Sequence, residues 1–268
     1  MTNMSKTNGE TPKIRMRNVH KRFGPKIVLD GFDLDVWPGE SVVIIGGSGS
    51  GKSVSLKCLL SLLHADSGTI EIDGEDITKM GAADRERINA KIGMLFQHAA
   101  LFDSLSVWEN VAFSLIQGKI MPAKQARDVA IEKLAQVGLD ADIGALNPAE
   151  LSGGMRKRVG LARAIAGDPE IIFFDEPTTG LDPIMGHIID DLIVKCVREV
   201  GATGLSITHD MPSARRISDR VTMLYHGKNI WTGNTDMLDR SGNEYVHQFV
   251  NGLPDGPIEQ RVLKAHAG

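Results

Sequence analysis

The sequence is poor in the features that mark several large classes of protein. Its 268 residues include only two cysteines, Cys58 and Cys196, and both lie inside apolar patterns with helical spacing. This fits a reducing compartment and argues against a disulfide framework. No run approaches the roughly 18 apolar residues that a membrane span requires. We therefore predict that both cysteines are core residues and that any association with a membrane depends on a partner.

The chain also lacks a strong imbalance of charge. Its formal net charge is -4, with 24% charged and 42% hydrophobic residues, as in ordinary globular proteins and unlike basic nucleic-acid-binding or disordered chains. This composition predicts no nucleic-acid partner. The length predicts one large α/β unit with a sub-domain.

Strand-like and helix-like segments alternate along the chain. Residues 1–12 are polar and without apolar periodicity, so we expect a flexible leader. Strands separated by glycine and proline turns are predicted at 14–19, 32–36, 41–45, 69–72, 93–96, 171–174, 205–208 and 221–225. Helical patterns cover 52–63, 107–137, 152–166 and 184–200. This alternation predicts a mostly parallel sheet, with its ligand site at the carboxyl ends of the strands.

The strongest motif is a glycine-rich turn between the apolar run VVII and a helical pattern. It matches G-x-x-x-x-G-K-[ST], in which glycines let backbone N–H groups approach phosphate oxygens, the lysine reaches the β- and γ-phosphates, and the last hydroxyl ligates Mg²⁺. By itself the motif leaves GTPases, kinases, helicases and transporters open. It predicts a nucleotide and Mg²⁺ site built from Gly46, Gly47, Ser48, Gly49, Ser50, Gly51, Lys52 and Ser53.

A second glycine pair lies in the run LSGGM, before a helical pattern with several basic residues. Ser152 is a suitable N-cap, and Gly153 and Gly154 expose backbone N–H groups, as expected of a phosphate-binding helix start. Taken alone, the run is equally well explained as an ordinary loop and cap.

Two carboxylates, Asp175 and Glu176, end the apolar run IIFF. A buried parallel strand directs both acids toward the phosphate end of the sheet. Asp175 is then suited to hold Mg²⁺, and Glu176 to polarise the attacking water as a general base. An isolated acidic pair is also explained by helix capping.

The order of these motifs, followed by GLD at 180–182 and SITHD at 206–210, resembles the ABC ATPase family over about residues 14–233. The resemblance implies a P-loop NTPase core of the RecA type with a mostly parallel sheet, a small antiparallel β sub-domain and an inserted helical sub-domain at about residues 98–166. It implies ATP and Mg²⁺ as cofactors, and hydrolysis by a homodimer. We assign residues 13–243 to this nucleotide-binding domain and 244–268 to a C-terminal extension.

The resemblance also implies roles for four further residues. Gln97 contacts Mg²⁺ or the attacking water, and His209 contacts the γ-phosphate. Asp182 belongs to a loop that crosses the dimer interface. Phe23 stands where the family keeps an aromatic residue, often tyrosine, that stacks on adenine, although packing in a turn also explains it. Met155 replaces the glutamine that many members carry, without changing the glycine pair before it.

Three segments resemble one branch of the family, the Mla or Mkl type ATPases of MCE-linked lipid transporters: residues 151–155, 95–105 and 249–257. This resemblance implies phospholipid cargo moved between inner and outer membranes. It implies an integral-membrane permease that docks near residues 97–105, an MCE-domain protein and, in some systems, a STAS-domain subunit. It places the chain at the cytoplasmic face of a bacterial inner membrane.

Rival functions differ in how well they fit. Soluble ABC ATPases of translation or DNA repair normally carry tandem nucleotide domains or a long coiled-coil insertion, and neither occurs in the sequence. An inert nucleotide-binding module would lack Lys52 or Glu176. An ABC ATPase for another cargo, such as amino acids, stays open because the permease selects the cargo.

The last segment continues beyond the motifs. Tyr245, Phe249, Val250 and Leu253 have the spacing of one face of a short helix, and the glycines and prolines at 252–257 then direct the chain into an extended exit. Such a segment docks either on its own subunit or on a neighbouring chain, and we favour the neighbouring chain.

Overall fold

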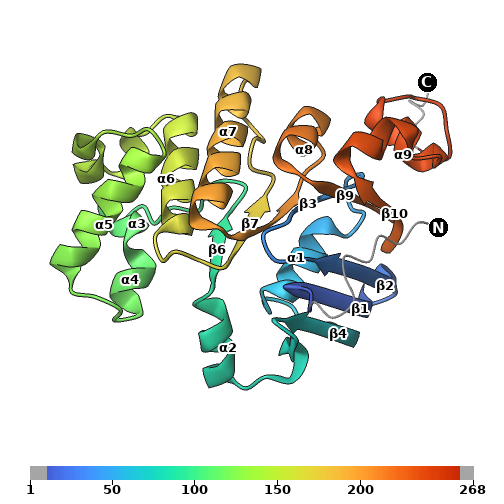
Figure 1. Cartoon of the computed structure of the whole chain (residues 1–268), viewed down its shortest axis with the longest axis horizontal. Coiled ribbons are helices and arrows are strands. Elements are labelled where there is room, and N and C mark those ends of the chain that lie inside the picture. Colours follow the sequence, from blue (N-terminus) through green and yellow to red (C-terminus); the bar gives the residue numbers. More distant parts are fainter. Residues whose placement is uncertain (1–10, 260–268) are drawn as a thin grey trace, which may run out of the picture.

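The computed structural model describes residues 11–259, which form two sheets surrounded by helices (Figure 1). The strands are β1 (Ile14–Phe23), β2 (Lys26–Val36), β3 (Ser41–Ile45), β4 (Ser67–Ile72), β5 (Glu75–Asp76), β6 (Ile92–Leu95), β7 (Ile171–Asp175), β8 (Thr203–Ile207), β9 (Arg220–Tyr225) and β10 (Lys228–Asn234). The helices are α1 (Lys52–Leu59), α2 (Ala82–Asn89), α3 (Val107–Val111), α4 (Phe113–Gln117), α5 (Ala123–Gln136), α6 (Gly153–Ile165), α7 (Pro183–Val200), α8 (Met211–Ile217) and α9 (Glu244–Val250). Short 3₁₀ segments lie at Ile77–Lys79 (η1), Ala141–Ala145 (η2), Pro148–Glu150 (η3) and Thr235–Arg240 (η4).

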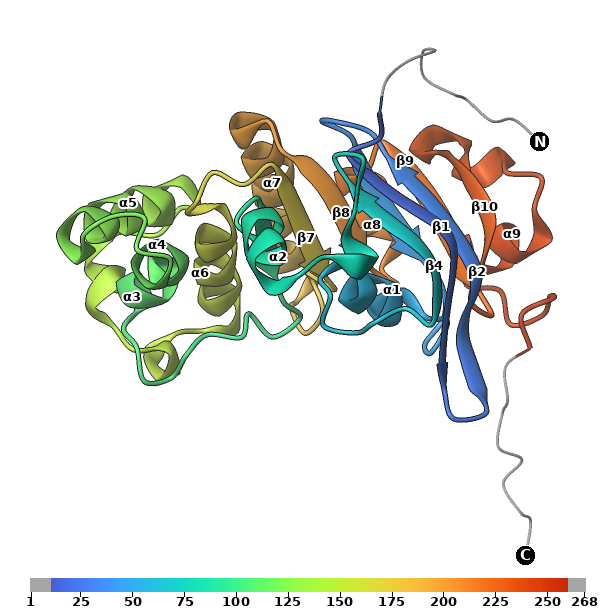
Figure 2. The same cartoon turned by 90° about the horizontal axis from the view of Figure 1, so that it is seen from below.

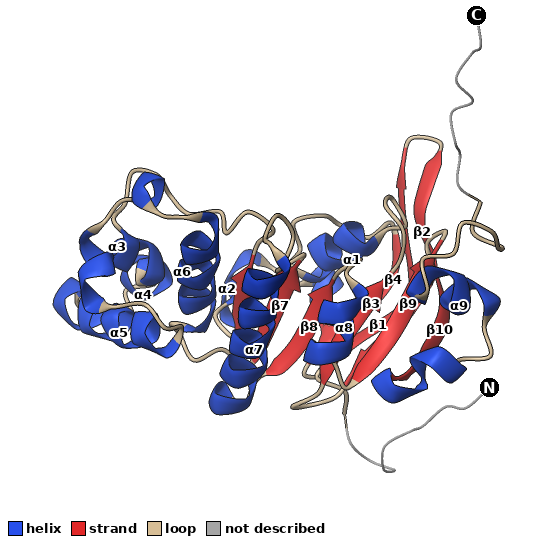
Figure 3. Ribbon diagram, turned by 90° about the horizontal axis from the view of Figure 1, so that it is seen from above, coloured by secondary structure: helices blue, strands red, loops and turns tan. Residues whose placement is uncertain are grey.

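The larger sheet has the strand order β10-β9-β3-β8-β7-β6. Its neighbours from β9 to β6 pair in parallel, and β10 pairs antiparallel with β9. After Ser41, β3 is apolar because both faces of the sheet are covered: Val43 and Ile45 pack with α7 and α8, whereas Val42 and Ile44 pack with α1 and the smaller sheet. Figure 3 shows α7 and α8 over one face of this sheet.

The smaller sheet is antiparallel, with the order β2-β1-β4-β5. Ile14, Met16 and Val19 of β1 are buried, the last after a register shift in the strand, and they share one apolar cluster with Leu56 and Leu59 of α1. In Figure 2 this sheet lies beside α1, at the opposite end of the molecule from α3 to α6. The predicted fold class, a mostly parallel core with a small antiparallel piece and a helical sub-domain, is confirmed.

Two helix predictions needed correction. The pattern over 107–137 forms three helices, α3, α4 and α5. The first break falls at Ala112, which caps both α3 and α4. The second follows because the chain turns after Gly118 and because Pro122 has no backbone N–H with which to continue a helix. The helix predicted over 52–63 ends at Leu59. Ser61 then adopts φ 56°, and the N–H groups of residues 62 and 63 both return to the carbonyl of Lys57 (2.9 and 3.1 Å).

Both cysteines are buried, as predicted, Cys58 in α1 and Cys196 in α7. Burial raises the pKa of each thiol to about 11, so neither is a reactive thiolate near neutral pH. Within residues 11–259, no helix combines the length and the apolar character needed to cross a bilayer.

The start of the C-terminal extension packs on its own chain. Val246 of α9 is fully buried, and the ring of Tyr245 lies 4.9 Å from that of Tyr225. The Gln248 side chain accepts from the N–H of Ile258 (2.7 Å) and donates to the carbonyl of the same residue (3.2 Å), which ties the following turns back to α9. The preference for docking on a neighbouring chain is therefore wrong for residues 244–259. Residues 260–268, and most of the predicted leader, lie outside the described residues.

Candidate functional site

The P-loop (residues 46–53) connects the carboxyl end of β3 to α1. Gly46 and Gly51 adopt φ values of 150° and 114°. A Cβ on Gly46 would lie 2.3 Å from the carbonyl oxygen of Leu224, and one on Gly51 would lie 2.7 Å from that of Val28. Only glycine fits both positions. The backbone can therefore wrap tightly around a phosphate at the N-terminus of α1.

Lys52 places a buried cation at this turn. The residue is 8% exposed, and its Nζ donates to the carbonyls of Gly46 (2.6 Å) and Gly47 (3.2 Å). Burial lowers the pKa of Lys52, while the carboxylates of Glu176 and Asp175 act in the opposite direction. The structure thus brings the P-loop lysine and both predicted acids into one site.

The residues predicted to hold Mg²⁺ offer oxygen ligands. Asp175 Oδ1 is buried and has no hydrogen-bond partner among residues 11–259. Burial, followed by the charge of Glu176, raises the pKa of this carboxyl. Ser50 Oγ in the P-loop is also buried without a partner, while Ser53 lies exposed in the first turn of α1. Hydroxyl, carboxylate and amide oxygens, the last from Gln97, suit a hard cation. The residues present therefore fit Mg²⁺ bound together with nucleotide phosphates.

Glu176 is held by several partners at the end of β7. Its Oε2 lies 2.9 Å from Nδ1 of His209 and accepts from the hydroxyls of Thr179 and Thr208, each at 3.3 Å. Its φ is 48°, and its N–H donates to the carbonyl of Ile207 (2.9 Å). The two threonines were not predicted from the sequence; their position beside the motifs EPTTG and SITHD was the available signal.

The LSGG segment (residues 151–154) begins α6. Ser152 is the N-cap, and its hydroxyl accepts from the backbone N–H three residues on (3.2 Å). A Cβ on Gly154 would lie 2.5 Å from Cε of Met185 in α7. Asp182 caps α7, accepting from the N–H groups two and three residues on (3.0 and 3.1 Å). The glycine pair and the loop with Asp182 therefore adjoin each other within one chain.

The LSGG segment and the P-loop do not meet within the chain. Strand β6, against which α6 packs, lies three places from β3 in the sheet, or about 14 Å at the usual strand spacing. Figure 2 shows α6 and α1 apart, with α2 and β7 between them. Ser152 and Gly153 are exposed. The two predicted phosphate-binding elements are therefore separate within one chain.

Phe23 lies at the end of β1, in the hairpin whose second strand passes the P-loop at Val28. Its side chain is 47% exposed, and Nζ of Lys21 lies 5.5 Å from the ring centroid. Lys21 also pairs with Asp66 (2.8 Å), which keeps the cation in place. An exposed ring steadied in this way is available for stacking on a planar base.

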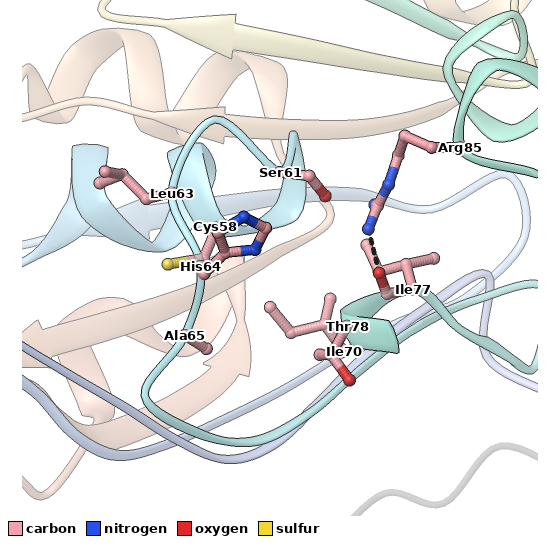
Figure 4. Close-up of a pocket in the computed structure, with 9 residues that line it drawn as sticks. All are labelled: Cys58, Ser61, Leu63, His64, Ala65, Ile70, Ile77, Thr78 and Arg85. Atoms are coloured by element: carbon pink, nitrogen blue, oxygen red, sulfur yellow. Dashed lines mark hydrogen bonds between the residues drawn. The ribbon is translucent and has the colours of Figure 1, made fainter. Parts of the chain in front are cut away.

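A small cavity lies near the end of α1 (Figure 4). Its volume is about 30 Å³, enough for a single water. Arg85 borders it, with a buried Nη1 that has no partner and an Nη2 that donates to the carbonyl of Ile77. The cavity is too small for a nucleotide and contains none of the motif residues. It is completed by Cys58, Ser61, Leu63, His64, Ala65, Ile70 and Thr78.

A P-loop lysine, two strand-end carboxylates and a histidine on one of them define a P-loop NTPase. Residues 29–179 match the family model described as "ABC transporter". The chain is 40% identical over 245 residues to the "Probable ribonucleotide transport ATP-binding protein mkl" of Mycobacterium leprae, covering 91% of this chain and 70% of that protein. It is 37% identical over 245 residues to the "Intermembrane phospholipid transport system ATP-binding protein MlaF" of Haemophilus influenzae, covering 91% and 92%.

A solved structure is similar as well. The dimeric ATP-binding cassette MJ0796, in a post-hydrolysis state bound to ADP and Pi, matches with a TM-score of 0.76 at 33% identity, over 83% of this chain and 98% of that one. The chain belongs to the ABC transporter family, and it is an ATP-binding subunit that hydrolyses ATP.

Proposed function

We propose that two copies of this chain close around two molecules of ATP with Mg²⁺, each site combining the P-loop of one copy with the LSGG segment of the other. The separation of these two phosphate-binding elements within one chain is the observation that carries the proposal. Each element has exposed residues that a second copy can reach, Ser48, Gly49 and Ser53 in the P-loop and Ser152 and Gly153 in the LSGG segment. The dimeric state of the similar cassette MJ0796 supports it.

In this arrangement each residue has a defined task. Lys52 binds the β- and γ-phosphates, and Ser53, Gln97 and Asp175 hold Mg²⁺, which would neutralise phosphate charge. Phe23 stacks on adenine.

The remaining assignments concern hydrolysis and the interface. Glu176 takes a proton from the attacking water as general base. His209, now 2.9 Å from the Glu176 carboxylate, contacts the γ-phosphate. Asp182, beside the glycine pair, lies at the interface of the two copies.

The Glu176→Gln variant tests the role of the general base. We expect ATP binding to be retained and hydrolysis to fall by roughly 10²–10⁴-fold, because the amide keeps the shape but cannot accept the proton. The control is Glu170→Gln, just before the opposite end of β7, where the carboxylate pairs with Lys91 at 3.4 Å. Steady-state phosphate release and equilibrium ATP titration separate the two properties. Turnover by Glu176→Gln at the rate of the control would exclude this assignment.

We further propose that the ATPase drives an integral-membrane permease at the cytoplasmic face of a bacterial inner membrane and that the cargo is phospholipid. The similarity to MlaF along nearly the whole of both chains supports this. An MCE-domain protein and a STAS-domain subunit are the further partners proposed. The alternative is another cargo: amino acids remain open, and the name of the mkl relative refers to ribonucleotides.

The cargo is tested with the chain assembled with its permease and MCE-domain protein in proteoliposomes. Phospholipid transfer to acceptor vesicles should depend on ATP and stop with Glu176→Gln, whose intact assembly is checked by co-purification. Transport of an amino acid or ribonucleotide, without lipid transfer, would favour the alternative.

A further inference from the structure

One buried cation links three segments of the catalytic region. Lys157 lies on α6 and is 5% exposed. Its Nζ donates to the main-chain carbonyls of Gln97 (2.5 Å) and Glu176 (3.2 Å). Gln97 follows β6 and Glu176 follows β7, the strands beside α6 in Figure 1. The ammonium group thus connects the helix that begins at the LSGG segment with two loops predicted to act on ATP.

A buried ammonium is unfavourable unless it has a specific task. Burial lowers the pKa of Lys157 to about 8, although the carboxylates of Asp175 and Glu176 favour the charged form. An apolar side chain of similar length would fill the same space without the cost of removing a charge from water. Packing alone therefore does not account for a lysine at this position.

The two acceptors indicate what the task is. Both are backbone carbonyls, so Lys157 fixes the path of two loops and leaves the Gln97 and Glu176 side chains free to act. Glu176 has φ 48°, a conformation that costs a non-glycine residue about 1 kcal/mol or more. Its N–H is bound by Ile207 (2.9 Å) and its carbonyl by Lys157. These two bonds hold the strained backbone that presents the carboxylate.

We propose that Lys157 is a positioning residue for ATP hydrolysis: it fixes the Gln97 and Glu176 loops to α6, so that seating of the LSGG segment on the partner's nucleotide sets the geometry of the general base. The inference rests on the proposed roles of Glu176 and of the LSGG segment. If the inference is correct, the turnover number depends on Lys157 but the affinity for ATP does not, because neither of its two hydrogen bonds is made to the P-loop.

The test compares substitutions of Lys157 in the full-length chain. Lys157→Met removes both hydrogen bonds at similar volume, Lys157→Gln keeps a neutral donor, and Lys157→Arg keeps the charge. The matched control is Lys133→Met, which removes a lysine that is 7% exposed and binds Asp168 (2.6 Å) away from the catalytic loops. Each variant is measured for kcat, for ATP affinity by equilibrium titration and for thermal stability.

We expect kcat to fall roughly 10–100-fold in Lys157→Met, the effect of losing hydrogen bonds to a charged group, with ATP affinity within about twofold of the parent chain. Lys157→Arg should recover a large part of the loss, and Lys133→Met should keep kcat. If Lys157→Met does not fold, Lys157→Gln takes its place.

The inference is overturned if kcat stays within about twofold of the parent, or if Lys133→Met loses as much. Glu176→Gln measured alongside separates the two claims. If that variant turns over normally, the proposed function fails; if it is inactive while the Lys157 variants are not, only the role of Lys157 fails.

Discussion

The conformation of Glu176 is fixed by several contacts at once. Its backbone lies in the left-handed region, and its carboxylate contacts His209 and the hydroxyls of Thr179 and Thr208. A strained backbone conformation of this kind persists only where several independent contacts enforce it. Here a strand end, two hydroxyls, a histidine and a buried lysine all fix the same residue, which suits the proposed role of general base.

Lys52 supports a prediction about nucleotide affinity. Its ammonium is the P-loop cation and faces both carboxylates. Lys52→Ala should weaken binding of ATP by roughly 10–100-fold, since hydrogen bonds from a charged donor to the phosphates are lost. Equilibrium titration with ATP and Mg²⁺ measures this. Lys57→Ala, an exposed lysine on the same helix, is the control, and equal affinities for the two variants would refute the assignment.

The sequence was sufficient for residues whose motifs fix both type and spacing, but not for residues defined by remote contacts. The P-loop and the Asp175-Glu176 pair could be located because each chemistry needs a short local pattern. Lys157 could not, because its acceptor in Gln97 is 60 residues away and a basic residue in a helix gives no signal of burial. The roles themselves remain predictions.

At the scale of elements, the periodicity predicted helix and strand types better than their ends. The five parallel strands of the larger sheet, β3, β6, β7, β8 and β9, were predicted within two residues of their observed ends, whereas the antiparallel β10 is not an apolar run and was not among the strands predicted from such runs. Helix α1 stops early because Ser61 turns left-handed without a glycine to mark the end. The end of α1 could not be predicted from the sequence, because the leucines at 59, 60, 62 and 63 continue the apolar pattern of the helix beyond it.

The contact between α7 and α8 predicts a pH effect on stability. Asp190 is 5% exposed and accepts a hydrogen bond from the Ser213 hydroxyl (2.6 Å). Burial raises the pKa of Asp190 to about 6. The charge of Asp210 also raises this pKa, whereas Arg216 and His187 lower it. The folded state therefore keeps a proton on Asp190 that the unfolded chain releases near pH 4. The contribution of Asp190 to the free energy of unfolding consequently declines as pH rises from about 4 to 6.

Asp190→Asn should remove this penalty, since the amide oxygen still accepts from Ser213 without charge. We expect it to stabilise the chain by about 1–3 kcal/mol at pH 7 and by little at pH 4. Urea unfolding at pH 4, 5, 6 and 7 provides the test. A difference between variant and parent that does not grow with pH would show that folding does not raise the pKa of Asp190.

At the scale of the whole molecule, the P-loop follows an inner strand of the larger sheet, β3, whereas the LSGG segment lies beside its β6 edge. The smaller sheet and α1 lie with the P-loop, whereas the helical sub-domain holds α6 at the β6 edge (Figure 2). The C-terminal helix α9 packs on its own chain beside η4, which in turn packs on β9 and β10. A second copy in the opposite orientation would bring its LSGG segment to the first copy's P-loop, and the symmetry of a homodimer would create two such sites.

Complementation between two inactive chains tests this claim most directly. Ser152→Arg disables the LSGG segment and Lys52→Ala disables the P-loop, so each variant alone should hydrolyse ATP at a small fraction of the parent rate. An equal mixture forms about one-half mixed dimers, each with one intact site of two, so about one-quarter of the parent activity is expected. A mixture no more active than the mean of the two separate variants, with mixed dimers shown to form, would contradict the shared site.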